Sequence, residues 1–245
     1  MDHIYKNIHG YSDNLIAAYE NFIKNNNKSH LKIVEVGVYL GRSASYLAVE
    51  LYNKNISFDL HLVDNNWDKI GRKEFYSSQH QSRFEKIMWL YDRVVNVDEE
   101  GRLMVAVSRK LMYFDKKEDF ANVRKENFKF IDEVTQNFKY FSDKVIFHQM
   151  DSKETSEKFD DNSVDLICLD ANHEYESISA DIKYWYPKLK YGGWIIGDDY
   201  CDQRGNGVKK AVIENFKDFW LIDNNGTIQK GDEKLSNGAW FLQKN

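Results

Sequence analysis

The spacing of apolar and polar positions near the start of the chain predicts a helix followed by a strand–helix–strand unit. Ser12 and Asp13 can cap a helix. The apolar residues behind them recur on one helical face: Leu15, Ile16, Tyr19, Phe22 and Ile23. Residues 31–38 form a short apolar run typical of a buried strand, residues 43–52 indicate a helix, and residues 58–64 alternate as a second strand. Strands joined through a helix imply a parallel sheet.

The middle of the chain, residues 65–143, interrupts this rhythm. Residues 82–95 and 123–141 have helix-like spacing, and no convincing third strand occurs before residues 144–150. A crossover between parallel strands needs only about a dozen residues. The pattern therefore predicts a helical insertion over residues 70–127, which serves as a lid, a substrate wall or a homo-oligomer contact, or is an excursion without a role.

The carboxyl-terminal part of the chain returns to alternating strands and helices. Strands are predicted over residues 163–170, 194–198, 220–223 and 239–243, and helices over residues 175–186 and 208–219. Pro187 should end the first of these helices, since proline lacks the amide proton that a helix uses. Together with the first strands, this pattern predicts one α/β domain over residues 1–245.

Composition and charge exclude several classes of function. The 245 residues include 34 Lys and Arg against 39 Asp and Glu, a net charge of −5 that argues against a general nucleic-acid binder. Cys168 and Cys201 are too few for a disulfide framework or a zinc site. The chain has neither an apolar run of about 18 residues nor the start of a signal peptide. We expect a soluble, cytoplasmic protein without a nucleic-acid or membrane partner.

A glycine-containing loop joins the first predicted strand to its helix, in the order Glu35-Val-Gly37-Val-Tyr39-Leu-Gly41-Arg-Ser43. Gly37 allows a tight turn beside a ligand, and Gly41 allows the helix start to pack close to it. Glu35, at the end of the strand, can receive the amino group of an amino-acid moiety. The dinucleotide fingerprint GxGxxG has glycine where this chain has Tyr39, whose bulk disfavours a pyrophosphate against the loop.

Two further acidic residues follow predicted strands. Asp64 ends the second strand, where a carboxylate can accept hydrogen bonds from both hydroxyls of a ribose. Asp151 follows the third strand of the sheet and can meet an adenine amino group. Either residue can instead simply cap a turn or the following helix.

These motifs together resemble the class I S-adenosylmethionine (AdoMet)-dependent methyltransferases, and most closely the methyltransferase-24 group and the macrocin-type sugar O-methyltransferases. The resemblance covers residues 31–68 and 128–245 and omits the insertion. Its most specific part runs from Asp170-Ala-Asn-His173-Glu-Tyr175 through Gly192-Gly193 to Asp198-Asp199-Tyr200.

The resemblance implies a Rossmann-like, mostly parallel sheet of seven strands, with AdoMet bound over the carboxyl ends of the first two. The cofactor-binding residues that follow from it are Glu35, Gly37, Tyr39, Gly41, Ser43, Asp64, Asn65, Trp67, Asp151, Ser152 and Asp170. Trp67 can also stack on an acceptor, although core packing is the more usual role for such aromatic residues.

In metal-dependent relatives, acidic or amide residues at the ends of two neighbouring strands hold a divalent ion, and the matching residues here are Asp170, Asp198 and Asp199. Three carboxylates suit Mg²⁺ or another hard divalent ion. Such an ion lowers the pKa of a bound hydroxyl and orients it. The two adjacent aspartates can also simply face water at a loop.

The general base implied by the resemblance is His173. Macrocin-type enzymes place an aspartate two residues after the first metal ligand, where this chain has Asn172, so their base is missing. Catechol-type relatives place the base three residues after that ligand, which is His173 here. A histidine suits proton removal because its pKa lies near neutrality. His173 can alternatively cap the following helix or bind the substrate.

The sequence thus predicts an O-methyltransferase, assisted by a divalent metal, that acts on a hydroxyl of a sugar, a glycan or a glycosylated small molecule. Two alternatives remain, a metal-independent methyltransferase of small molecules and a catalytically silent AdoMet-binding module. An iron-dependent hydroxylase would need two histidines in the pocket, and only His173 is expected there.

Overall fold

The computed structural model describes residues 1–8, 10, 12–65, 67, 70–76, 88–90, 96–97, 103–107, 110–114, 123–201, 207–235 and 238–245. The chain divides into two compact units. The first comprises Met1–Trp67 and Val134–Asn245, and the second comprises Asp68–Glu133. None of the described helices combines the length and the hydropathy that a membrane-spanning segment needs.

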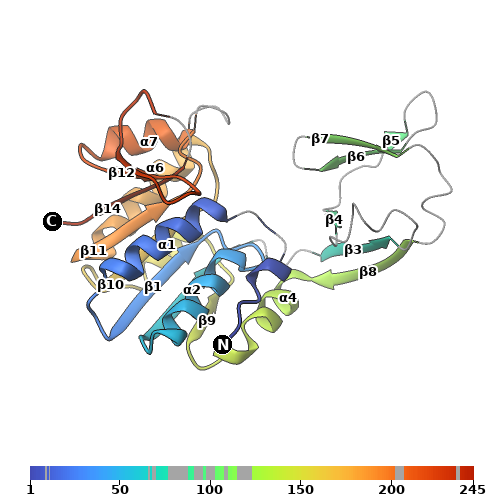
Figure 1. Cartoon of the computed structure of the whole chain (residues 1–245), viewed down its shortest axis with the longest axis horizontal. Helices are drawn as coiled ribbons and strands as arrows, with labels where there is room; N and C mark the ends of the chain where they lie inside the picture. The colour runs from blue at the N-terminus through green and yellow to red at the C-terminus, as the bar shows by residue number, and fades with distance from the viewer. Residues whose placement is uncertain are drawn as a thin grey trace. The chain divides into compact units, whose positions relative to one another are not determined.

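The first unit is built on an eight-stranded sheet in the order β13-β12-β14-β11-β10-β1-β2-β9 (Figure 1). Its strands are β1 (His30–Val36), β2 (Ser57–Val63), β9 (Val145–His148), β10 (Val164–Leu169), β11 (Leu189–Gly197), β12 (Trp220–Ile222), β13 (Ile228–Lys230) and β14 (Ala239–Gln243). The neighbouring strands β9, β2, β1, β10 and β11 run parallel to one another. Strand β14 pairs antiparallel with β11, and β12 pairs antiparallel with β14 and β13. The predicted Rossmann-like, mostly parallel sheet is confirmed, with β13 as an eighth, short edge strand.

Helices cover both faces of this sheet. Those of the first unit are η1 (Tyr5–Asn7), α1 (Asp13–Asn25), α2 (Arg42–Asn53), η3 (Lys139–Phe141), α5 (Ser152–Ser156), α6 (Tyr175–Trp185), η4 (Tyr186–Lys188) and α7 (Gly207–Asn215), and α4 (Phe130–Asn137) leads into it. Helices α1 and α2 pack on one face. Helices α6 and α7 bury Ile182, Trp185 and Val212 against Val34 and Ile167 of the sheet. Helix α6 ends just before Pro187, as predicted.

The register of the parallel strands aligns their carboxyl ends. Val36 of β1 lies opposite Val63 of β2 and Leu169 of β10, and Leu169 lies opposite Gly197 of β11. The loops that leave these four strands therefore start at one level of the sheet edge, where open α/β sheets bind their ligands.

In the second unit, the described residues between Ile70 and Lys129 form strands, so the insertion predicted at residues 70–127 is not helical in them. This unit contains β3 (Ile70–Tyr76), β4 (Met88–Leu90), β5 (Asn96–Val97), β6 (Leu103–Val107), β7 (Lys110–Phe114) and β8 (Val123–Lys129). These form two antiparallel three-stranded sheets, β4-β3-β8 and β5-β6-β7. The predicted insertion at residues 70–127 falls within this unit.

The helix predicted over residues 123–141 begins only at Phe130, because residues 123–129 pair with β3 along its whole length. That partner lies about fifty residues away, and local spacing carries no information on such a pairing. Of the helix predicted over residues 82–95, Met88–Leu90 is a strand and the remainder lies outside the described residues.

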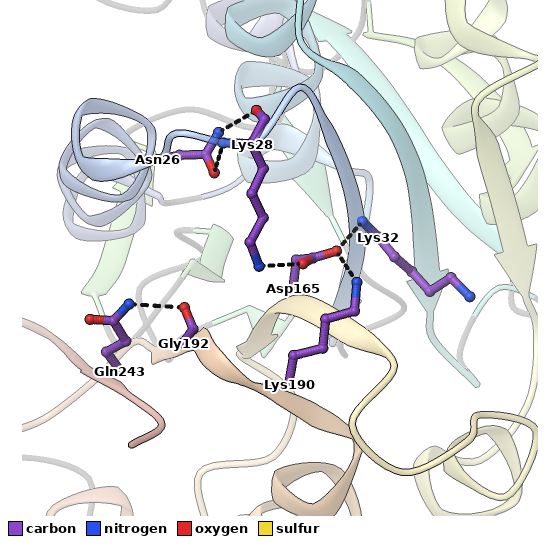
Figure 2. Close-up of polar contacts among 7 residues, drawn as sticks. All are labelled: Asn26, Lys28, Lys32, Asp165, Lys190, Gly192 and Gln243. Atoms are coloured by element: carbon purple, nitrogen blue, oxygen red, sulfur yellow. Dashed lines mark hydrogen bonds and ion pairs between the residues drawn. The ribbon is translucent and has the colours of Figure 1, made fainter.

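A buried aspartate joins the amino ends of the strands, at the edge opposite the aligned loops. Asp165 of β10 accepts hydrogen bonds from the ammonium groups of Lys28 at 2.7 Å and Lys190 at 2.8 Å, and from the backbone N–H of Lys32 at 2.9 Å. Figure 2 shows these contacts around the carboxylate. Burial alone would raise the pKa of Asp165, but the hydrogen bonds from Lys190, Lys28 and Lys32 hold it below its ordinary value. Three segments are tied together at this carboxylate.

We predict that Asp165→Ala lowers the free energy of unfolding by about 2 kcal/mol, because it leaves the Lys32 N–H and two ammonium groups without their shared acceptor. Urea unfolding measures this loss. Asp161→Ala is the control, since Asp161 pairs with Lys188 at 2.7 Å with its side chain 64% exposed, and should cost less than about 1 kcal/mol.

The loss should depend on pH. A carboxyl with a lowered pKa stabilises the fold at neutral pH, and the benefit disappears as the pH falls through that pKa. The difference between wild type and Asp165→Ala should therefore shrink in acid. Equal losses for the two variants at neutral pH would contradict the role assigned to Asp165.

Candidate functional site

Four of the predicted site residues follow the aligned strands directly. Gly37 follows β1, Asp64 follows β2, Asp170 follows β10 and Asp198 follows β11. Backbone hydrogen bonds extend the ladder into these loops, from Gly37 N to Val63 O at 2.9 Å and from Asp170 N to Val36 O at 2.8 Å. The tertiary structure thus brings the glycine loop and the acidic strand ends to one edge of the sheet.

The two loop glycines are required by close packing within the protein. Gly37 has φ +87°, and a Cβ there would lie 2.3 Å from the carbonyl oxygen of Asp170. Gly41 is the N-cap of α2 with φ +82°, and its Cβ would lie 2.4 Å from the Phe138 ring. From the sequence, both glycines were expected to let a ligand lie close to the backbone. The structure shows that they first allow the loop to lie against β10 and against Phe138.

Asp64 fixes the glycine loop. Its Oδ2 accepts the backbone N–H of Tyr39 at 2.8 Å and that of Val38 at 3.2 Å. Trp67 donates its indole N–H to the carbonyl oxygen of Tyr39 at 2.7 Å and is fully buried, with its ring 5.6 Å from that of Phe147. These contacts hold Tyr39 at φ +54°, an unusual angle for a residue with a side chain. Contact with a cofactor stays a prediction for Asp64, for Trp67 and for Asn65, which is exposed beside Asp64.

Glu35 lies beneath the loop, with none of its surface exposed. Its carboxylate accepts the hydroxyl of Tyr19 from α1 at 2.7 Å and the hydroxyl of Ser43 from α2 at 2.6 Å. Burial raises the pKa of Glu35 to about 7, and the two hydroxyl donors oppose that rise. Glu35 and Ser43 therefore support the loop from inside, and their contact with a cofactor stays a prediction. The part played by Tyr19 was missed, since helical spacing marked it only as a core residue.

Asp151 and Ser152 have local partners. Asp151 is the N-cap of α5 and accepts the N–H of Lys153 at 2.8 Å, which is the capping alternative that the sequence left open. Ser152 donates to Asp181 at 2.5 Å and accepts the indole N–H of Trp185 at 2.9 Å. Asp151 is exposed at the end of β9, where its proposed meeting with adenine stays a prediction.

A histidine lies between two carboxylates at the ends of β10 and β11. His173 Nε2 is 2.6 Å from Asp199 Oδ2 and 3.6 Å from Asp170 Oδ1. One ligand atom from each residue lies within 4.8 Å of the others, which suits a single metal ion. Asp199 has φ +57°, and strained backbone of this kind clusters at functional sites.

Burial and like charge set the electrostatics of this cluster. Burial raises the pKa of Asp170 to about 7, with Asp198 and Asp199 adding to the rise and His173 opposing it. Burial, then the charge of Asp199, raises the pKa of Asp198 to about 6. The hydrogen bonds to Asp170 and Asp199 raise the pKa of His173 to about 9. The cluster therefore favours positive charge among its carboxylates.

The third predicted metal ligand, Asp198, is not one of the described residues whose ligand atoms converge. Its Oδ1 accepts the backbone N–H of Asp199 at 2.8 Å and the side-chain amide of Asn14 at 3.2 Å. The three residues with converging ligand atoms are thus Asp170, His173 and Asp199. Asn172, at the position of the absent macrocin-type base, accepts the N–H of Glu174 at 3.0 Å and caps the approach to α6. The sequence carried no signal for Asn14, because the contact spans nearly the whole chain.

A methyltransferase-domain family, methyltransferase 24, matches residues 34–200, a range that runs from β1 through the acidic end of β11. The chain belongs to this family. It is an AdoMet-dependent methyltransferase, and the match includes the glycine loop, Asp64 and the whole Asp170, His173 and Asp199 group.

Two solved structures share the fold, and one further protein matches a short part of the sequence. An uncharacterized protein of Acanthamoeba polyphaga mimivirus is 30% identical over 66 residues, which are 27% of this methyltransferase and 27% of that protein. The O-methyltransferase NovP is 18% identical, with a TM-score of 0.53 over 95% of this chain and 78% of NovP. A Staphylococcus aureus protein proposed to be a caffeoyl-CoA O-methyltransferase is 14% identical, with a TM-score of 0.51 over 98% of this chain and 87% of its own.

We predict that Gly37→Ala destabilises this methyltransferase by several kcal/mol, because a methyl group 2.3 Å from a backbone oxygen forces β1 and β10 apart. Gly226→Ala is the matched control, since Gly226 has φ +80° with no atom within 4 Å of its Cβ position. It should show only the cost of a left-handed angle, about 1–2 kcal/mol. Urea unfolding compares the two. Equal destabilisation would show that the contact with Asp170 imposes no constraint.

Proposed function

We propose that this methyltransferase transfers a methyl group to a hydroxyl oxygen with the help of a divalent metal ion, and that its acceptor is a sugar, a glycan or a glycosylated small molecule. The observation that carries the metal part is the convergence of Asp170, His173 and Asp199 beside the glycine loop. The acceptor class is supported by the resemblance to macrocin-type sugar O-methyltransferases and by the similarity to NovP, an O-methyltransferase.

The residues around the glycine loop fit a sulfonium nucleoside. Tyr39 occupies the position where a pyrophosphate-binding loop has glycine, and AdoMet has no pyrophosphate to accommodate. In this proposal Asp64 and Asn65 meet the ribose, Asp151 and Ser152 meet the adenine, and the strand end at Gly37 and Asp170 borders the amino-acid moiety. Glu35, Ser43, Gly41 and Trp67 contribute by keeping the loop in place.

The acidic residues fit a hard divalent ion such as Mg²⁺. Asp170 and Asp199 offer carboxylate oxygens to a common point, and Asp198 adds a third carboxylate at the adjacent position. Burial raises the pKa values of Asp170 and Asp198 and neighbouring carboxylates add to the rise, so a cation at this position would be attracted. When bound, the metal supplies orientation and acidity to a hydroxyl group, and AdoMet supplies the methyl group.

His173 is the residue we assign to proton removal from the acceptor when a divalent ion is bound. Its hydrogen bonds to Asp170 and Asp199 raise its pKa to about 9, so that it holds a proton without the ion. A cation held by those carboxylates would lower that pKa and let the ring accept a proton. His173 lies at the centre of the group with its side chain 31% exposed, so that it is both within reach of the carboxylates and open to a substrate. The remaining work of the site is alignment, because a displacement at a methyl carbon depends on bringing oxygen, carbon and sulfur into line.

One observation favours a second candidate, metal-independent methylation of a small molecule. The His173 imidazole already bridges Asp170 and Asp199 and supplies positive charge to them. In that case the aspartates and His173 would bind the acceptor directly, and chelators would leave the rate unchanged.

The cofactor part of the proposal predicts that S-adenosylhomocysteine stabilises the protein. A ligand at about 100 times its Kd adds about 2.7 kcal/mol to the free energy of unfolding, which corresponds to a rise of about 5–10 °C in Tm for a chain of this size. A thermal melt with and without the nucleoside measures the shift, with adenosine alone as the control. An unchanged Tm at saturating concentration contradicts cofactor binding.

The metal part predicts that Asp170→Ala abolishes methyl transfer and binding of Mn²⁺ while S-adenosylhomocysteine still binds. Loss of one carboxylate from a site of this kind removes a direct ligand, whereas the nucleoside is held mainly by the loop. Radiolabelled methyl transfer and Mn²⁺ titration are the measurements, and Asp160→Ala, at an exposed position, is the control. A wild-type rate that EDTA does not reduce would exclude the metal and favour the second candidate.

A further inference from the structure

Helix α1 is held rigidly against the sheet. Tyr19 is completely buried and donates to Glu35 at the end of β1, and the Phe22 ring lies 5.8 Å from that of Trp194 in β11. The helix packs on β11 and β14. The first turn of α1 is therefore fixed relative to the end of β11, which is where Asp198 begins its loop.

Asn14, in that first turn, contacts the acidic cluster. Its amide nitrogen donates to Asp198 Oδ1 at 3.2 Å, and the backbone N–H of Asp199 donates to the same oxygen at 2.8 Å. Two donors from different directions restrict rotation of the carboxyl group. Within the described residues neither donor contacts Oδ2, so the second oxygen is the one available to a ligand.

The chemistry of Asn14 suits a partner of a metal ligand. A lysine or arginine at this position would neutralise Asp198 and compete with a cation, whereas an amide orients the carboxylate and leaves its charge intact. Asn14 contributes a hydrogen bond and no charge, whereas His173 of the cluster itself supplies positive charge near Asp198.

The residues just before α1 reach the other side of the site. Arg42, at the start of α2, donates to the carbonyl oxygens of Tyr5 at 2.9 Å and Ile8 at 2.8 Å. A Cβ at Gly10 would lie 3.5 Å from Arg42 and 3.8 Å from the Tyr39 ring. The start of the chain thus lies against the glycine loop, and Asn14 continues it to the end of β11.

We propose that Asn14 is a positioning residue of the metal site, which restrains the Asp198 carboxylate through Oδ1 and leaves Oδ2 to bind the divalent ion. This inference rests on the proposed function, because it needs a metal ion at the cluster. It makes the first turn of α1, a segment outside the family match at residues 34–200, part of the site.

The test is Mn²⁺ binding to the Asn14→Ala variant. Binding is measured by calorimetry and by the electron paramagnetic resonance signal of free Mn²⁺, and neither measurement involves methyl transfer. Loss of a hydrogen-bond partner of a metal ligand typically weakens metal affinity by about 10–100-fold. We expect the Kd for Mn²⁺ to rise at least about 10-fold, while the Kd for S-adenosylhomocysteine changes less than about two-fold. Asn14→Gln, which keeps an amide donor, should recover part of the affinity.

Asn21→Ala is the matched control, because Asn21 belongs to the same helix and, among the residues that the structure describes, hydrogen-bonds within that helix to Asn25. An Mn²⁺ affinity of Asn14→Ala equal to that of Asn21→Ala would overturn the inference. So would a parallel loss of nucleoside binding, since that indicates a general structural role.

The Asp170→Ala variant distinguishes a failure of the proposed metal site from a failure of the role of Asn14. If wild type binds Mn²⁺ and Asp170→Ala does not, the metal site stands whatever Asn14 does, and an unaffected Asn14→Ala refutes only its positioning role. If wild type binds no Mn²⁺, the metal part of the proposed function and this inference fall together.

Discussion

The register of the parallel strands is the constraint on which the site depends. Because Val63, Val36, Leu169 and Gly197 occupy equivalent positions on β2, β1, β10 and β11, the residues that follow them meet at one edge. A slip of one residue between two strands would turn every side chain of one strand to the opposite face of the sheet. The Asp165 carboxylate, which joins three segments at the other edge, and the glycine packing at Gly37 both resist such a slip.

The loops at this edge are held by polar groups that face inward. Asp64 binds the backbone of the glycine loop, Trp67 binds the same loop from the core, and Glu35 joins α1 and α2 beneath it. Residues that a motif would assign to ligand binding thus also maintain the shape of the glycine loop. Such preorganisation reduces the conformational entropy that a ligand must remove on binding.

The acidic cluster concentrates negative charge where two strands end. Desolvation raises the pKa of Asp170 and Asp198, and the adjacent carboxylates add to that rise through repulsion. His173 reduces this repulsion and is itself drawn toward its protonated form. A divalent ion would meet the same electrostatic demand more fully, which is why this geometry and the proposed chemistry are consistent with each other.

Outside residues 65–143, the main strands and helices and the glycine loop between them were predictable from the sequence, because alternation and helical spacing are local properties. The family and its Rossmann-like fold followed from the resemblance that the glycine loop and the acidic motifs carry. The close pairing of Gly37 with Asp170 was expected only in outline. Local patterns failed for residues 123–129, whose strand depends on a partner about fifty positions away. They also could not show Asn14 beside Asp198 or Tyr19 on Glu35. Those contacts join distant segments, so only the packing of α1 on the folded sheet decides them.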